Sequence, residues 1–331
     1  MKNILLVGAL LTSFIAPITQ AATKVKIATQ YPDGTYSLIQ LRDAAKQIKE
    51  RTEGRVEIKL YPGGVQGGNT TVLKKINKGL LGGAMLEGGA FAADYADSQV
   101  YNAPMFFNGY DEVDAVRAEL DSVIESGLSD AGWNTFGLIE GGFAYAMTNN
   151  PVTSVTELKQ QKLWLPSNDP LVARIAQELE ISPIYLGIGE VLTSLQTNSI
   201  NAIVAPPVAA LALQWFSKVK YVTDVPFMYT YGTLAISDKI FNKISAEDQI
   251  IVREVLTAAV VLMDEDSRKE NLKAFDALAS QNIKSIEPTD EQKKALAIES
   301  QGAIKALIEG GEFSQQIFDQ MKSIVEKHRA L

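Results

Sequence analysis

Few residues in this chain are of the types that carry out covalent chemistry. The sequence has no cysteine and one histidine, His328, so it offers no thiol nucleophile and no thiolate metal site. A Ser-His-Asp triad would have to use His328, which continues an apolar helical stripe near the chain end. The helix dipole alone favours a histidine in such a last turn. We therefore expect no catalytic residue, no metal and no cofactor.

Two short patterns are similar to enzyme motifs but lack the partners of those motifs. Residues 217–220 (SKVK) have the S-x-x-K spacing of penicillin-recognising acylases, without the accompanying Lys-Thr-Gly or Ser-Asp-Asn segment. Residues 187–189 (GIG) lack the third glycine of a dinucleotide-binding loop and are interpreted as a turn. No pair of carboxylates is singled out for glycoside hydrolysis. A hydrolase stays open only as the alternative function.

The sequence pattern predicts helices and strands most clearly between Ser154 and Pro207, and these elements could position the residues of a site. Ser154 and Glu157 have the spacing of a capping box at a helix start. Asp169 and the proline after it likewise predict the start of a helix. The pattern predicts strands at 162–165, 183–186 and 200–205, with helices after the first two of them, near 170–179 and 189–198. Strands that alternate with helices indicate a largely parallel sheet.

Four segments along the chain resemble one protein family. They are 54–68 (GRVEIKLYPGGVQGG), 102–116 (NAPMFFNGYDEVDAV), 150–170 (NPVTSVTELKQQKLWLPSNDP) and 178–207 (ELEISPIYLGIGEVLTSLQTNSINAIVAPP). Their order is similar to that in the DctP-type substrate-binding receptors of TRAP transporters, the tripartite ATP-independent periplasmic uptake systems. The resemblance implies an α/β fold, a two-lobed periplasmic binding protein (type II-like) with a long helix spanning both lobes.

The same resemblance gives a domain organisation. A chain of 331 residues is long enough for two cores. We expect lobe 1 to comprise residues 22–142 plus about 225–250, and lobe 2 to comprise 143–224 plus about 275–331. Residues 143–148 would cross between the lobes, and strands at 220–227 and 232–237 would return. The run 245–282, which contains no glycine or proline, would be the helix that spans both.

The chain begins with features of a secretory signal peptide. Lys2 precedes an apolar run from Ile4 to Ala16, and residues 19–21 (TQA) fit a cleavage site, so residues 1–21 are expected to be removed. A membrane anchor would need ~20 apolar residues in a row. The formal net charge of −8 argues against nucleic acid as a partner. We expect a periplasmic monomer that binds a small molecule and works with the small and large membrane subunits of a TRAP permease.

The resemblance also places the ligand site. Trp164 stands where the family usually has an arginine that grips the substrate carboxylate, and Ala144 and Ala205 stand near two other common polar contacts. Tyr31 and Glu87 fall in loops that face the cleft in the family. The residues expected to bind the ligand are Tyr31, Glu87, Phe143, Tyr145, Trp164 and Pro206.

Trp164 determines the expected ligand class. An arginine offers a fork of donors that matches a carboxylate, whereas an indole offers one N–H donor and a large apolar face. The prediction is a hydrophobic or aromatic ligand and not a simple carboxylate. Two alternatives stay open at this point: a ring-bearing cation stacked on Trp164, or a second basic residue, such as Arg174, in the role of the missing arginine.

Overall fold

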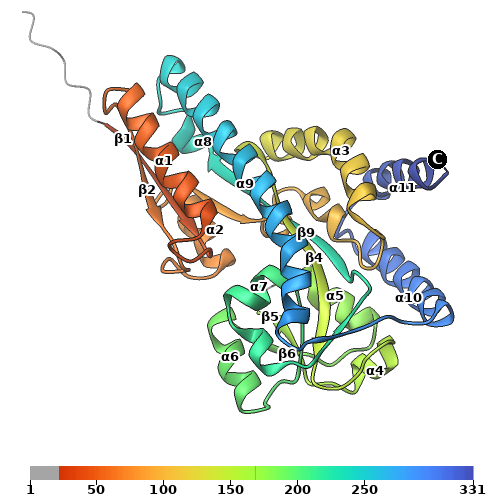
Figure 1. The fold of residues 1–331 in the computed structure, drawn as a ribbon. Coiled ribbons are helices and arrows are strands. Elements are labelled where there is room, and N and C mark those ends of the chain that lie inside the picture. The colour runs from red at the N-terminus through yellow and green to blue at the C-terminus, as the bar shows by residue number, and fades with distance from the viewer. Residues whose placement is uncertain (1–21, 168, 331) are drawn as a thin grey trace, which may run out of the picture.

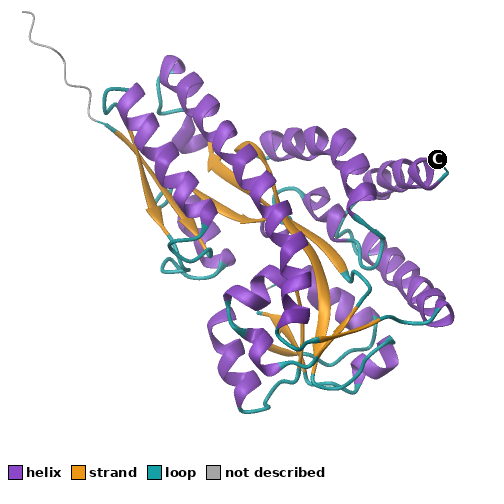
Figure 2. Cartoon of the chain, viewed as in Figure 1, coloured by secondary structure: helices purple, strands orange, loops and turns teal. Residues whose placement is uncertain are grey.

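The protein has two lobes, joined by elements that run through both of them (Figure 1). The computed structural model describes residues 22–167 and 169–330, so the expected signal peptide lies outside the described residues. Among these residues, no helix is long and apolar enough to cross a membrane. Helices cover the sheet in both lobes, as Figure 2 shows.

One mixed sheet runs through the molecule in the order β2-β1-β3-β9-β4-β7-β5-β6, and β8 pairs with β4 and β10. β1 is parallel to β2 and β3, and β5 is parallel to β6 and β7, whereas β4 and β9 run antiparallel to their neighbours. The strands are β1 (Thr23–Thr29), β2 (Val56–Tyr61), β3 (Gly83–Glu87), β4 (Trp133–Thr148), β5 (Leu163–Pro166), β6 (Ile184–Leu186), β7 (Ala202–Ala205), β8 (Tyr221–Thr223), β9 (Met228–Ser237) and β10 (Lys284–Ile286).

The helices lie between these strands and after them. The α-helices are α1 (Tyr36–Arg51), α2 (Asn69–Asn77), α3 (Tyr110–Asp130), α4 (Val155–Lys159), α5 (Pro170–Glu178), α6 (Ile188–Gln196), α7 (Pro207–Ala212), α8 (Asp238–Phe241), α9 (Ala246–Ser280), α10 (Asp290–Glu309) and α11 (Gln315–Arg329). Three short 3₁₀ helices are η1 (Gly88–Phe91), η2 (Ala96–Asn102) and η3 (Trp215–Lys218).

The crossing between the lobes takes place within β4. Ala144 still pairs with Met228 on β9, and the next residue, Tyr145, pairs with Ala205 on β7. β4 therefore exchanges its neighbour between these two residues, inside the segment expected to cross. β9 lies against β3 and so returns the chain to lobe 1. β8 does not return, because it pairs with the end of β4 and with β10, which corrects the expectation for residues 220–227.

Helix α9 is the longest element, and Figure 1 shows it passing from the upper lobe into the lower one. It begins where Ser245 accepts a hydrogen bond from the backbone N–H of Asp248, over 3.2 Å. Side-chain capping of this kind supplies a partner for a backbone donor that the helix itself leaves free. Its bounds fall within the predicted 245–282.

The last helix packs differently from the expectation that residues up to 331 accompany lobe 2. α11 lies on α3, where the guanidinium of Arg329 donates to both carboxylate oxygens of Glu112, at 2.7 and 2.9 Å. His328 contacts Asp111 on the same helix at 3.1 Å. The only histidine thus joins two surface helices, which is a structural role. α10, by contrast, lies against α5.

Candidate functional site

The carboxyl ends of parallel strands from the two lobes come near each other at Glu87 and Asp169. In lobe 1, Tyr31 follows β1 and Glu87 is the last residue of β3; in lobe 2, Asp169 follows β5 and Pro206 follows β7. The negative charge of Asp169 contributes to a raised pKa of Glu87, so the two carboxylates lie close enough to interact. Ligands of open α/β sheets bind outside the carboxyl ends of the strands. We call these four residues and the backbone around them the interlobe site.

The lobe 1 edge is held in shape by backbone hydrogen bonds between its loops. The N–H of Gly63 donates to the carbonyl of Tyr31 over 2.8 Å, and Gly64 donates to Thr29 over 3.0 Å. Both glycines have positive φ, 64° and 70°, a conformation that L side chains rarely adopt. Tyr31 is half-buried. Burial, with a smaller effect of the Glu87 charge, raises the pKa of Tyr31 to about 12, so its hydroxyl stays protonated and can donate.

Glu87 is the last residue of β3 and reaches solvent. The protein around it nevertheless displaces enough water to raise its pKa to about 7, and Asp169 adds to this effect. Desolvation also raises the pKa of Asp169, with a further contribution from Glu312. The carboxylate of Asp169 caps α5 by accepting from the N–H of Val172 over 3.2 Å. The interlobe site is therefore acidic, and it concentrates negative charge from both lobes.

Tyr145 and Pro206 provide the half-buried apolar surface of the lobe 2 edge. The ring of Tyr145 packs against Phe275 of α9 with 4.9 Å between centroids. Its backbone pairs with Ala205, which precedes Pro206, so the two residues lie side by side. Pro206 is also the residue from which α7 begins.

Phe143 and Trp164 lie in the cores. Phe143 is 2% exposed and its ring contacts Tyr229 and Tyr110, at 5.5 and 4.7 Å between centroids. Trp164 is 4% exposed, its indole N–H donates to the carbonyl of Leu186 over 3.1 Å, and its ring meets Trp215 edge-on at 5.1 Å. With its single donor satisfied and its ring packed, Trp164 offers no open face for a ring-bearing cation.

Arg174 does not stand in for the missing arginine in this arrangement. Its Nη2 contacts Glu178 at 3.0 Å and its Nη1 donates to Gln177 over 3.3 Å, both on its own helix, α5. A Cβ added to Gly310, at the end of α10, would lie 3.8 Å from its Nε. The side chain therefore fills the junction of α5 with α10, and its charge is paired.

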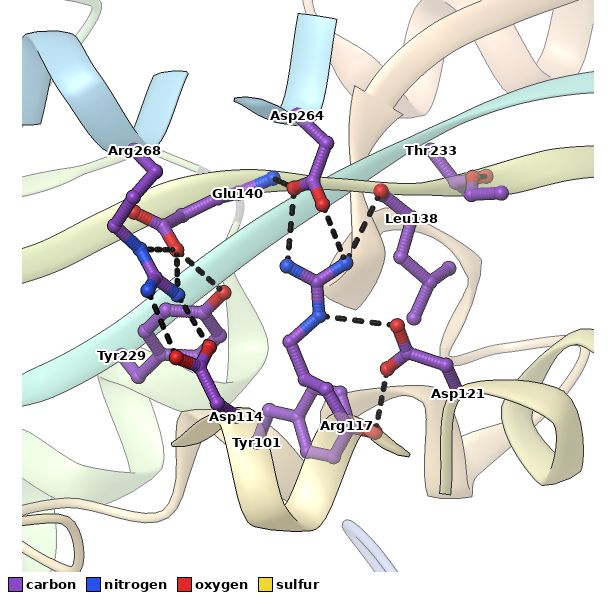
Figure 3. A network of polar contacts seen from close by, with 11 residues as sticks. Tyr101, Asp114, Arg117, Asp121, Leu138, Glu140, Tyr229, Thr233, Asp264 and Arg268 are labelled. Carbon is purple, nitrogen blue, oxygen red and sulfur yellow. Dashed lines mark hydrogen bonds and ion pairs between the residues drawn. The ribbon is translucent and has the colours of Figure 1, made fainter. Parts of the chain in front are cut away.

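A network of charged residues lies where the elements that run through both lobes meet α3 (Figure 3). Arg117 donates to Asp264 at 3.0 and 3.1 Å and to Asp121 at 3.0 Å. Arg268 donates to Glu140 at 2.6 Å and to Asp114 at 3.0 and 2.7 Å. We call these six residues the hinge network.

A groove of about 510 Å³ opens beside the hinge network, lined by its six residues together with Ala118, Glu265 and Lys269. Both guanidinium groups of the network are already engaged by carboxylates. Hydrogen-bonded pairs of this kind leave little capacity for a ligand, so we assign the groove to structure. Among residues 22–167 and 169–330, no cluster of His, Asp and Glu side chains could hold a metal ion.

The comparisons with known proteins agree with this architecture. A family model described as bacterial extracellular solute-binding protein, family 7 (DctP), matches residues 27–310. The sialic acid-binding periplasmic protein SiaP of Vibrio cholerae is 22% identical over 253 residues, which are 75% of this chain and 78% of that protein.

Solved structures extend the likeness to the whole fold. A TRAP periplasmic solute-binding protein from Haemophilus influenzae with bound L-gulonate aligns with a TM-score of 0.81 at 21% identity, over 91% of this chain and 99% of that one. A second, from Sulfurospirillum deleyianum with bound succinate, aligns with a TM-score of 0.79 at 17% identity, over 92% and 99%. At these identities the structures establish the two-lobed fold, not the ligand.

Proposed function

This chain belongs to the DctP family, family 7 of the bacterial extracellular solute-binding proteins, and we propose that its interlobe site captures a small ligand other than a simple carboxylate. The protein is a periplasmic substrate-binding receptor of a TRAP-type transporter, which works with the membrane subunits of the permease. The observation that carries the proposal is that Glu87 of lobe 1 and Asp169 of lobe 2 lie close enough for the charge of Asp169 to raise the pKa of Glu87. We propose that the receptor acts as a monomer.

The expected site residues enter the proposal in two groups. Tyr31, Glu87, Tyr145 and Pro206 are proposed to contact the ligand, because each is half-buried or exposed at a facing edge. Phe143 and Trp164 are proposed to support Tyr145 and the ends of the strands from within the cores. A tryptophan with a satisfied N–H cannot replace an arginine as an anion anchor.

The ligand is proposed to present an apolar or aromatic surface to Tyr145 and Pro206. Burial of ~300 Å² of apolar surface at ~25 cal/mol per Å² contributes roughly 7.5 kcal/mol before the costs of binding, enough for weak to micromolar affinity. The names of the relatives argue the other way, because they describe proteins with sialic acid, L-gulonate and succinate. The acidic character of the interlobe site supports the departure from these ligands.

A thermal-shift screen of small metabolites tests this function. A ligand at 100 times its Kd stabilises the folded state by about 2.7 kcal/mol, which raises the melting temperature measurably. Small-angle scattering with each hit should show compaction, since a ligand can close the lobes only by binding the closed state better. Tight binding of C4-dicarboxylates or sialic acid would refute the proposed ligand class and leave the receptor function intact.

The alternative function is a hydrolase on a similar two-lobed scaffold. Recovery of the ligand after incubation distinguishes it from a receptor. A receptor returns its ligand chemically unchanged after prolonged incubation, and mass spectrometry of the recovered ligand checks this. Formation of a product at a rate above that of a buffer control would overturn the receptor function.

A further inference from the structure

Two buried amide side chains of η2 turn their oxygens toward the same place. Gln99 is 2% exposed and its Nε2 donates to the backbone carbonyl of Glu312 over 2.9 Å. Asn102 is 8% exposed and its Nδ2 donates to the carbonyl of Tyr229 over 2.8 Å. A backbone carbonyl can only accept, so these two bonds fix which end of each amide is nitrogen. The opposite ends are therefore acceptors.

Both acceptors lie beside Gly89, two residues after Glu87. A Cβ built on Gly89 would lie 3.5 Å from Oε1 of Gln99 and 3.9 Å from Oδ1 of Asn102. Neither oxygen accepts a hydrogen bond from any residue that the structure describes. Neither is among the fully enclosed polar atoms that lack a partner, so both oxygens reach solvent. Two oriented amide oxygens that reach solvent are free to accept from a donor on a ligand.

The charged side chains around Gly89 and the two amide oxygens are all negative. Glu87 lies on the same short segment as Gly89, the charge of Asp169 acts on Glu87, and Glu312 acts on Asp169 while it accepts from Gln99. None of these three carboxylates forms an ion pair with a described residue. Like charges without a counter-charge repel a carboxylate and attract a protonated nitrogen.

We propose that the interlobe site recognises its ligand by a protonated nitrogen group, an ammonium or guanidinium, which donates to Glu87, Gln99 and Asn102 while Asp169 approaches it from the other lobe. This inference rests on the proposed receptor function and names the ligand class. Each N–H of such a group meets an acceptor that the protein leaves free. The positive charge also offsets the repulsion between Glu87 and Asp169, so the ligand favours approach of the two lobes.

The test uses two pairs of probes that differ in the charged group: 1,4-diaminobutane against succinate, and 2-phenylethylamine against 3-phenylpropionate. We expect at least one amine to raise the melting temperature of the protein, and neither carboxylate to do so. Glu87→Gln should weaken the amine at least about tenfold in calorimetry, because a charge-assisted hydrogen bond is lost. Glu119→Gln is the matched control, since it removes the same charge from an exposed position on α3, and its affinity should equal that of the native protein.

The outcomes separate this inference from the proposed function. Stabilisation and compaction by a carboxylate, with no response to either amine, overturn the inference and leave the receptor function standing. No response to either amine also counts against it, because three carboxylates and two free amide oxygens should hold a simple ammonium at millimolar concentration. Equal affinity of an amine for Glu87→Gln and for the native protein would show that its nitrogen does not bind at Glu87. If no compound of these pairs or of the metabolite screen compacts the protein, the receptor function fails as well.

Discussion

Arg268 on α9 and Glu140 on β4 form a buried ion pair in which Nε lies 2.6 Å from Oε2, and the Glu140 side chain is fully shielded from solvent. The same guanidinium donates hydrogen bonds to both carboxylate oxygens of Asp114 on α3. Burial raises the pKa of Glu140, and the Arg268 charge opposes this. A single arginine thus ties α3 to the two elements that run through both lobes, next to the point where β4 changes its neighbour.

Removal of Arg268 should destabilise the protein strongly. Arg268→Ala leaves Glu140 buried without its counter-charge, and breaking a buried pair in this way costs about 3 to 5 kcal/mol. Urea unfolding measures the loss. Lys46→Ala is the control, because Lys46 and Glu50 form an exposed pair at 3.9 Å and its removal should cost less than about 0.5 kcal/mol. Equal losses in the two variants would show that the buried pair does not hold α3 and α9 to β4.

Gly142 should resist substitution more than another glycine of the same backbone conformation. Gly142 has φ +89° and an added Cβ would overlap the amide of Asn271 on α9, whereas Gly132 has φ +91° and nothing within 4 Å. Alanine at either position incurs a backbone cost of about 1 to 2 kcal/mol. Gly142→Ala should lose more than that, measured by urea unfolding alongside Gly132→Ala. A smaller loss at Gly142 would mean that α9 shifts to make room.

Local signals in the sequence predicted much of the fold. Ser154, Asp169 and Ser245 stand at predicted helix starts, and each side chain accepts the expected backbone hydrogen bond. These signals work because a cap and its helix lie within four residues. The apolar pattern of the central block likewise predicted the bounds of β5, β6 and β7 to within two residues.

The burial of Trp164 could not be predicted in the same way. Leu163, Trp164 and Leu165 are all buried because helices cover both faces of β5, so alternation along the strand carries no information about which side chain meets the ligand. The amide oxygens of Gln99 and Asn102 were missed for a related reason. Their role depends on contacts with Glu312 and Tyr229, which lie more than 120 residues away in sequence.

Substitution of Trp164 should affect stability before it affects binding. Trp164→Phe removes one donor to the Leu186 carbonyl, which still accepts from the N–H of Ser167 over 3.2 Å, so the substitution should cost about 0.5 to 1.5 kcal/mol, the usual net contribution of one hydrogen bond. Trp164→Arg places a charge in the core of lobe 2 and should cost several kcal/mol more. Thermal unfolding measures both. A stable Trp164→Arg protein with altered ligand affinity would indicate that Trp164 contacts the ligand.

The affinity for an amine should depend on pH through Glu87. Its pKa of about 7 means that the carboxylate is largely protonated at pH 6 and ionised at pH 8, so binding of 2-phenylethylamine should strengthen across this interval and level off above it. Tyr31, with a pKa of about 12, stays neutral throughout. Two other acidic groups contribute charge. Asp169 raises the pKa of Glu87, and Glu312 raises the pKa of Asp169.

The stability of the ligand-free protein should decrease as the pH rises, whereas its affinity for an amine increases. A carboxyl whose pKa is raised on folding binds its proton more tightly in the folded state, so the free energy of unfolding falls as pH rises from the unfolded pKa of about 4.5 through about 7. Glu87→Gln removes this titration and should flatten both curves, while Glu119→Gln should leave them as in the native protein. Calorimetry and urea unfolding at pH 6, 7 and 8 provide the two curves. A native protein whose amine affinity is unchanged between pH 6 and 8 would show that the carboxylate of Glu87 does not receive the ligand nitrogen.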